Sequence, residues 1–292
     1  MHALLFGLLL QASPYTLSIG NPGSVTVSLD QIVSTSTSRP VTVSDIAKAA
    51  EGKQFVYLGE SHNNPDHHKM QAAVIAELVK QGREVIVGFE MFTRPAQINL
   101  NPWTLGWWDE ATFIEQSNWK KEWGFDYALY RPIFETIKAN RLPMVALNVP
   151  RDWVRAVGKG GYAALTPEWK KELPDPLFLG NDKHKEIFAA MMGGHPMTGT
   201  AGENIYAAQV LWDEGMADTA IKYMNSHMVS PKTVFVVVAG AGHVMYGQGI
   251  NYRVGLHTKM TGVTLTMVDG TEPLTVSRGL GDFVYMAKPG AE

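Results

Sequence analysis

Four segments of the chain carry glutamate, histidine or arginine at or just after the end of an apolar run. Gly59-Glu60-Ser61-His62 follows the first run, Glu90 ends the second, Asn148 and Arg151 follow the third, and Gly240-Ala241-Gly242-His243 follows the fourth. Carboxylate, imidazole and guanidinium groups can transfer protons, hold a metal ion or bind a charged ligand. One glutamate at a strand end is commonly a solvated loop residue, so the recurrence at four ends is what predicts a site.

These segments meet only if the apolar runs are strands of one parallel sheet. The first two runs flank a helix that begins at Pro65-Asp66, and this spacing is typical of a βαβ unit. In an open parallel sheet, ligands bind beyond the carboxyl ends of the strands. Six runs have strand length and composition: Phe55–Glu60, Glu84–Glu90, Pro143–Val149, Thr233–Gly240, Val263–Val268 and Phe283–Met286.

The predicted fold class is therefore α/β, with a mostly parallel open sheet flanked by helices. Two long helical stretches, residues 102–140 and 151–227, exceed what simple crossovers need. We expect them to form a helical cap over the carboxyl ends of the strands.

The amino-terminal part divides into two segments before a single domain at residues 45–292. Residues 1–13 resemble a short signal peptide, because Ala3–Leu10 is apolar but too short to span a bilayer. A buried strand or a misassigned start is the alternative, since almost no charge precedes this run. Residues 14–44 are rich in Ser and Thr and predict an exposed lead-in that contributes an edge strand and no functional residue. A periplasmic or secreted protein with no membrane span is expected.

Composition excludes several function classes. The net charge of −3 and a pI near 6.3 provide no basic surface for nucleic acid. With no cysteine, the chain cannot form disulfides, iron–sulfur clusters, thiolate-ligated haem or a lipoprotein anchor. No nucleophile elbow, Walker loop or His-Glu-x-x-His motif is present, and Gly240-x-Gly242 lacks Rossmann spacing.

Further polar residues fall within apolar helical stripes. His67 and His68 lie at the start of the helix after His62, and at least one of them should point inward, as a ligand contact or as a hydrogen-bonded core histidine. Gln209 and Asp213 occupy an apolar stripe of the later helix, where they would either orient pocket histidines or bond another helix.

Two other segments have both a functional and a packing interpretation. The loop from Met191 to Met197 carries polarizable side chains that could fold over a flat apolar ligand, or it could be an irregular connection. Five tryptophans between positions 103 and 123 could wall such a ligand, although packing of the cap is favoured.

At these residues the sequence resembles the ChaN-like haem-binding family, within the group that also holds erythromycin esterases and the TraB/Tiki proteins. The matching segments are Leu58–His68, Gly88–Phe92, Ala146–Arg151, Gln209–Ala217 and Ala239–His243, in the expected order over about residues 45–270. The resemblance implies haem or iron uptake, a tyrosine iron ligand, paired haems enclosed by a homodimer, and outer-membrane uptake components as partners. Tyr246, close to His243 in the sequence, is the first choice for that tyrosine.

The predicted function is binding of haem or a related tetrapyrrole, with Tyr246, His243 and His62 as candidate iron ligands. The alternative is a hydrolase in which His62 or His243 activates water, directly or through a divalent metal, while Glu60 and Glu90 orient the imidazoles and Arg151 stabilises negative charge. A third interpretation is a scaffold with a degenerate pocket. The predicted cofactor-binding residues are Glu60, His62, His67, His68, Glu90, Arg151, His243 and Tyr246.

Overall fold

The computed structural model describes residues 13–193, 197–227 and 229–291. Its centre is an eight-stranded sheet in the order β3-β2-β10-β8-β4-β7-β5-β6. From β10 to β6 all neighbouring strands are parallel, while β2 and β3 are joined to this block by antiparallel pairing. The strands are β2 (Ile32–Ser34), β3 (Arg39–Val41), β4 (Phe55–Glu60), β5 (Glu84–Thr93), β6 (Met144–Asn148), β7 (Thr233–Gly240), β8 (Gly262–Asp269) and β10 (Phe283–Ala287).

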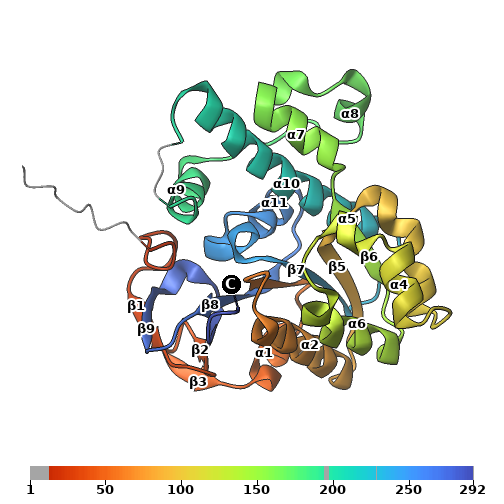
Figure 1. The fold of residues 1–292 in the computed structure, drawn as a ribbon. Helices are drawn as coiled ribbons and strands as arrows, with labels where there is room; N and C mark the ends of the chain where they lie inside the picture. The colour runs from red at the N-terminus through yellow and green to blue at the C-terminus, as the bar shows by residue number, and fades with distance from the viewer. Residues whose placement is uncertain (1–12, 194–196, 228, 292) are drawn as a thin grey trace, which may run out of the picture.

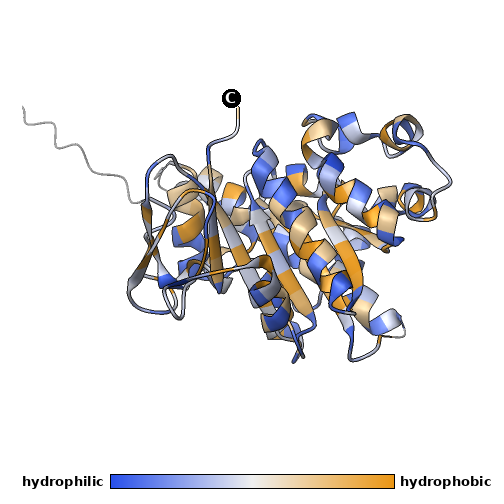
Figure 2. Cartoon of the chain, turned by 90° about the horizontal axis from the view of Figure 1, so that it is seen from below, coloured by the Kyte–Doolittle hydropathy of each residue, from blue (hydrophilic) through white to orange (hydrophobic). Residues whose placement is uncertain are grey.

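The predicted fold class is confirmed, and all six predicted runs are strands. Every residue of β4 and of β7 is buried. Parallel strands covered on both faces have this continuous apolar character, which is why the runs could be recognised. Figure 2 shows the largely hydrophobic strands between helices with hydrophilic outer surfaces.

The strand order differs in one respect from a simple succession of βαβ units. β7 lies between β4 and β5 and pairs with both of them. The helix between β4 and β5 therefore crosses over a position that a strand from much later in the chain occupies. This insertion places Glu60 and Gly240 at the ends of β4 and β7, beside Glu90, which lies three residues before the end of β5.

Helices cover both faces of the sheet (Figure 1). One face packs against α1 (Val43–Ala49), α2 (Pro65–Lys80) and α6 (Tyr127–Asn140), and the other against α10 (Gly199–Ser226) and α11 (Ile250–His257). Short helices α3 (Asn101–Thr104), α4 (Glu110–Gln116) and α5 (Trp119–Glu122) extend the first layer. Helices α7 (Arg151–Gly160), α8 (Pro167–Lys171) and α9 (Asp182–Met191) lie with α10 on the opposite side of the view from α1 and α2.

Helix α2 begins where the sequence places it. The side chain of Asn64 accepts hydrogen bonds from the backbone of Asp66 and His67, and Pro65 occupies the first turn. Such a cap satisfies amides that have no partner within the helix. The cap fixes the loop from Glu60 to Asn64, which carries His62.

The lead-in is more than an edge strand. β2 and β3 do form one edge of the main sheet, while β1 (Ser24–Val27) pairs with β9 (Leu274–Ser277) in a separate two-stranded sheet. Leu17, Ile19 and Val27 are buried in a shared core with β10. The proposed signal-peptide segment lies outside the described residues, except for Ser13.

Candidate functional site

A cavity of about 1000 Å³ lies beyond the carboxyl ends of β4, β5 and β7. Helices α7, α9 and α10 form its other walls, so the stretch 151–227 supplies the expected cap, whereas α6 of the stretch 102–140 packs on a face of the sheet. The cavity brings together Glu60, His62, Glu90, Arg151 and His243, five of the eight predicted site residues. Its apolar lining includes Trp123, Phe125, Val154, Phe188, Met191, Met192, Ile205 and Trp212.

One side of the cavity is formed by His62 and the buried carboxylate of Glu60. Nδ1 of His62 donates to Oε1 of Glu60 at 2.7 Å, and Nε2 of His68 lies 3.1 Å from Oε2. The hydroxyl of Tyr130 donates to Oε1 at 3.1 Å. Burial alone would raise the pKa of Glu60, but the hydrogen bonds from His62 and His68 outweigh it and lower this pKa to about 2.

The imidazole of His62 is held by its surroundings as well as by Glu60. The ring makes edge contacts with Trp123, at 4.6 Å between centroids, and lies 5.6 Å from Phe125. A Cβ on Gly240 would lie 2.7 Å from Cε1 of His62, so only glycine leaves room for the ring. Burial lowers the pKa of His62, yet the hydrogen bond and charge of Glu60 give a net increase.

His243 follows the end of β7, and each of its ring nitrogens lies close to a carboxylate. Nδ1 donates to Oδ1 of Asp213 at 2.6 Å, and Nε2 lies 3.2 Å from Oε1 of Glu90. The side-chain amide of Gln209 lies 3.0 Å from Nδ1. Although burial opposes the charged form, Glu90 and Asp213 raise the pKa of His243 to about 10. Glu90 and Asp213 therefore favour the charged form of the His243 ring, while its roles as iron ligand or general base stay predictions.

Gln209 and Asp213 thus orient a pocket histidine, as one of the two interpretations of their stripe predicted. Oδ2 of Asp213 lies 2.9 Å from Nε2 of His184 and 3.7 Å from the guanidinium of Arg253. Arg253 is fully buried and pairs with Glu214 at 3.0 Å. His184, Arg253 and Glu214 were not predicted, because no apolar run or motif marks them.

His67 and His68 both point inward and are fully buried, but neither lines the cavity. Nδ1 of His67 accepts from the backbone amide of Ser61 at 3.0 Å, and its Nε2 faces the carbonyl of Val268. His68 supports Glu60 from behind and stacks near Tyr130 at 3.9 Å. In this structure they are hydrogen-bonded core histidines, which was the alternative interpretation, and they support the loop that carries His62.

Tyr246 is also absent from the cavity wall. The backbone of Tyr246 has a positive φ of 58°, and its buried hydroxyl donates to the carbonyl of Pro14 and accepts from the amide of Leu17. Its closeness to His243 in sequence is lost because this turn directs the ring toward the lead-in. The tyrosine that lines the cavity is Tyr15, from the segment expected to carry no functional residue.

Two arginines and an apolar wall complete the cavity. Arg151 and Arg155 both line it from α7, where Arg155 pairs with Asp152 at 2.7 Å. Residues four apart lie on the same helix face, so both cations can meet negative groups of one ligand. Met191 and Met192 line the wall as the flat-ligand interpretation predicted, although residues 194–196 of that loop are outside the described part.

The tryptophans divide between the two roles. Trp103 and Trp119 are buried in the aromatic core beneath α6, as packing predicts. Trp123 alone of the five lines the cavity.

In the part of the chain that the structure describes, no group of three or more acidic or histidine side chains is arranged to hold a metal ion. None of the described helices is both long enough and apolar enough to cross a membrane.

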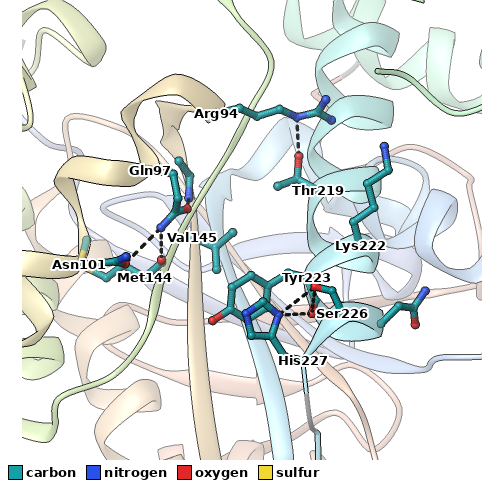
Figure 3. Close-up of a pocket in the computed structure, with 12 residues that line it drawn as sticks. Arg94, Gln97, Asn101, Met144, Val145, Thr219, Lys222, Tyr223, Ser226 and His227 are labelled. Carbon is teal, nitrogen blue, oxygen red and sulfur yellow. Dashed lines mark hydrogen bonds between the residues drawn. The ribbon is translucent and has the colours of Figure 1, made fainter. Parts of the chain in front are cut away.

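A second, more open cavity of about 720 Å³ lies between β6, the turn Arg94–Asn99 and the last turns of α10 (Figure 3). Its polar groups are largely used in structural bonds. The amide of Gln97 donates to the carbonyl of Met144 and accepts from Ala146, so it closes the free edge of β6. Arg94 is bonded to Thr219 and Asp218. We therefore place the candidate site in the first cavity.

Comparisons with known proteins identify the family and support the fold. The family described as haem-binding uptake, Tiki superfamily, ChaN matches residues 46–254. The solved structure of cofacial haem binding to ChaN of Campylobacter jejuni is 18% identical, covering 87% of this chain and 95% of that one with a TM-score of 0.64. A mutant of the erythromycin esterase EreC in its open conformation is 13% identical over 80% of this chain and 78% of its own, with a TM-score of 0.46. No curated protein matches the sequence.

Proposed function

The chain belongs to the ChaN family of haem-binding uptake proteins in the Tiki superfamily, and on this basis we propose that it binds haem in the cavity beside His62. The observation that supports this most is the pairing of an extended apolar wall with an imidazole that has one free nitrogen. Pockets for flat organic ligands have this composition, with few polar groups among many apolar ones. Haem, when bound, supplies an iron that needs such a ligand.

The residues that line the cavity fit both the apolar ring and the charged carboxylates of an iron-porphyrin. Phe188, Ile205 and Trp212 offer apolar area to the macrocycle, while Arg151 and Arg155 offer cations to its carboxylates. The site lies at the carboxyl edge of a parallel sheet, where this architecture generally binds ligands.

A hemin titration of the purified protein tests the proposal. We expect a Soret band that saturates at a defined ratio. An Ile205→Glu variant places a charge in the apolar wall and is expected to weaken hemin binding at least about tenfold, since burying an unpaired charge costs well over 1.4 kcal/mol. Leu256→Glu is the matched control, because Leu256 is a similarly exposed apolar residue on α11 outside the cavity. Binding that never saturates, or equal losses in both variants, would refute the site.

We further propose a role in haem or iron uptake outside the cytoplasm, with a second copy and outer-membrane components as partners. Exposed apolar side chains at the cavity mouth, Phe125, Met191, Met192 and Ile205, support a covering partner. Light scattering with and without hemin tests the homodimer, and fractionation of producing cells tests the location. A monomer at all hemin ratios would exclude the homodimer, and a cytoplasmic protein would exclude the uptake role.

Hydrolysis is the second candidate, and the pair Glu60–His62 favours it. A histidine whose Nδ1 is fixed by a buried carboxylate can accept a proton at Nε2 from water, with Arg151 placed to stabilise an oxyanion. Glu60→Gln should then abolish ester turnover while hemin binding persists. Absence of turnover on a panel of esters by the intact protein would eliminate this candidate.

A further inference from the structure

We propose that an apolar tip, formed by Ile98, Leu105 and Trp107, docks this protein on a lipid surface that carries negative charge. The three side chains are 77%, 51% and 74% exposed, which places them among the most exposed large apolar side chains of the described residues. All three lie within ten residues, between β5 and α4. None of them lines the cavity at the ends of β4, β5 and β7, so this inference does not depend on haem binding.

The segment that carries the tip is fixed to the edge of the sheet by polar side chains. The amide of Gln97 bonds the backbone of β6, the outermost strand, at two points, 2.9 and 2.8 Å away. The hydroxyl of Thr104 donates to the carbonyl of Leu142 at 2.9 Å. A surface helix generally keeps its polar side chains for the solvent. Here two of them bind the sheet, while Ile98 and Leu105 face outward.

Trp107 is held outward by an ordered turn. Gly106 has a φ of +73°, and its backbone amide donates to the carbonyl of Trp103 at 2.9 Å. The amide of Trp107 donates to the carbonyl of Pro102, also at 2.9 Å, which completes the helix end known as a Schellman motif. The backbone of Trp107 is therefore fixed although its indole is exposed. Exposed apolar side chains gathered on an ordered surface generally mark an interaction site.

Cations lie beside the tip. Nζ of Lys138 donates to the backbone carbonyl of Trp108, the residue after the tip, at 2.7 Å. Arg141, the C-terminal cap of α6, is exposed and adjoins the backbone that Thr104 binds. The two nearest acids are engaged, since Asp109 caps α4 and Glu110 pairs with an arginine at 2.8 Å. Lysine and arginine close to an anionic lipid surface strengthen binding to it.

The size and composition of the tip favour a lipid surface over a protein partner. A stable protein interface generally takes about 20–30 residues from each partner, whereas the tip consists of three protruding side chains. The edge of β6 is also closed to a partner strand, because Gln97 occupies its hydrogen-bonding groups. Tryptophan and aliphatic side chains with lysine or arginine beside them are typical of surfaces that lie in the membrane interface.

Cosedimentation of the intact chain with lipid vesicles tests the proposal. We expect binding to vesicles of phosphatidylcholine with phosphatidylglycerol, and weaker binding to phosphatidylcholine alone or at high salt, which screens the charges. Trp107→Ser should lower the partition coefficient about tenfold, because the indole is no longer buried in lipid, and Trp107→Phe should restore most of it. Leu256→Ser is the matched control, since Leu256 is 50% exposed on α11, which packs on the other face of the sheet.

Two further measurements locate the contact. Brominated phosphatidylcholine should quench part of the tryptophan fluorescence of the intact chain, and this part should be missing from Trp107→Phe although that variant still binds. Arg141→Gln should reduce the preference for vesicles that contain phosphatidylglycerol. The hemin titration of Trp107→Ser should match that of the unchanged protein, so a failure of the tip and a failure of the haem proposal are distinguishable.

Several results would overturn the proposal. They are an intact chain that does not sediment with either kind of vesicle, an equal loss in Leu256→Ser, and undiminished binding in Trp107→Ser, which would place the membrane contact in another segment. Light scattering without lipid gives the last one. If the intact chain self-associates and Trp107→Ser does not, the tip is a contact between copies of this chain.

Discussion

Replacing Asp213 with asparagine is expected to destabilise the protein strongly although it preserves side-chain volume. The buried carboxylate of Asp213 accepts a hydrogen bond from His243, lies 2.9 Å from the ring of His184 and faces Arg253. Asparagine leaves these groups without their counter-charge. Removing one partner of a buried ion pair generally costs about 3–5 kcal/mol, because the remaining charge is uncompensated.

That loss converts into a measurable melting temperature. A chain of 292 residues has an unfolding entropy near 0.6 kcal/mol/K, from about 2.1 cal/mol/K per residue. The melting temperature of Asp213→Asn should therefore fall by about 5–8 °C at pH 7 in differential scanning calorimetry. Asp152→Asn is the matched control: its exposed pair with Arg155 should matter by about 2 °C or less.

The pH dependence checks the cause. His243 has a raised pKa, near 10, so the stability it contributes is complete below its ordinary value of 6.5 and is lost as the pH rises toward 10. Asp213 has a lowered pKa, so its contribution is present above 3.8 and is lost at lower pH. The difference between the two proteins should shrink at both extremes. A fall under about 2 °C at pH 7, or a difference that grows from pH 7 to 10, would refute the reasoning.

Three further predictions concern single contacts. Tyr246→Phe removes two hydrogen bonds to the lead-in and should lower the free energy of unfolding by about 1–3 kcal/mol in denaturant titrations. The hemin spectrum should stay the same, because the ring lies outside the cavity. An altered spectrum would contradict this placement. Gly240→Ala should lower hemin affinity about tenfold in a titration, because the added Cβ displaces the ring of His62. Circular dichroism checks that the variant is folded. Unchanged affinity would mean that the position of the ring is unimportant for binding. Gly88→Ala puts a Cβ 2.4 Å from the ring of Phe235 and should lower the free energy of unfolding by about 1–3 kcal/mol through overpacking. Gly82→Ala is the control on the surface, where the substitution acts only through the positive φ of Gly82. Its near-ultraviolet circular dichroism spectrum should match that of the unchanged protein.

Much of the fold could be predicted because buried parallel strands are continuous apolar runs. β4 and β7 were predicted at their observed bounds for this reason. The short strands of the lead-in were not located, because three-residue strands such as Ile32–Ser34 are too brief for a recognisable period. The periodicity of a sequence does not reveal the order of strands in a sheet, so the position of β7 between β4 and β5 could not be derived.

The site was predicted in part for a related reason. Glu60, His62, Glu90 and His243 follow strands, and the edge of a parallel sheet brings such positions together. Asp213 was recognisable as a charge inside an apolar helical stripe. The positions of Tyr15 and Tyr246 could not be predicted, because distance along the chain says little about which wall a tyrosine faces, and at Tyr246 a positive-φ turn intervenes.

The central position of β7 also has a consequence for synthesis on the ribosome. β4 and β5 emerge long before Thr233–Gly240, and until that segment is available each presents an unpaired hydrogen-bonding edge. Open parallel edges in a nascent chain invite wrong pairing and aggregation. His243 lies three residues after β7, the strand that completes the sheet. A nascent chain in which β7 is not yet inserted therefore has neither a complete sheet nor a pocket. Ligand therefore cannot be captured before this strand is inserted.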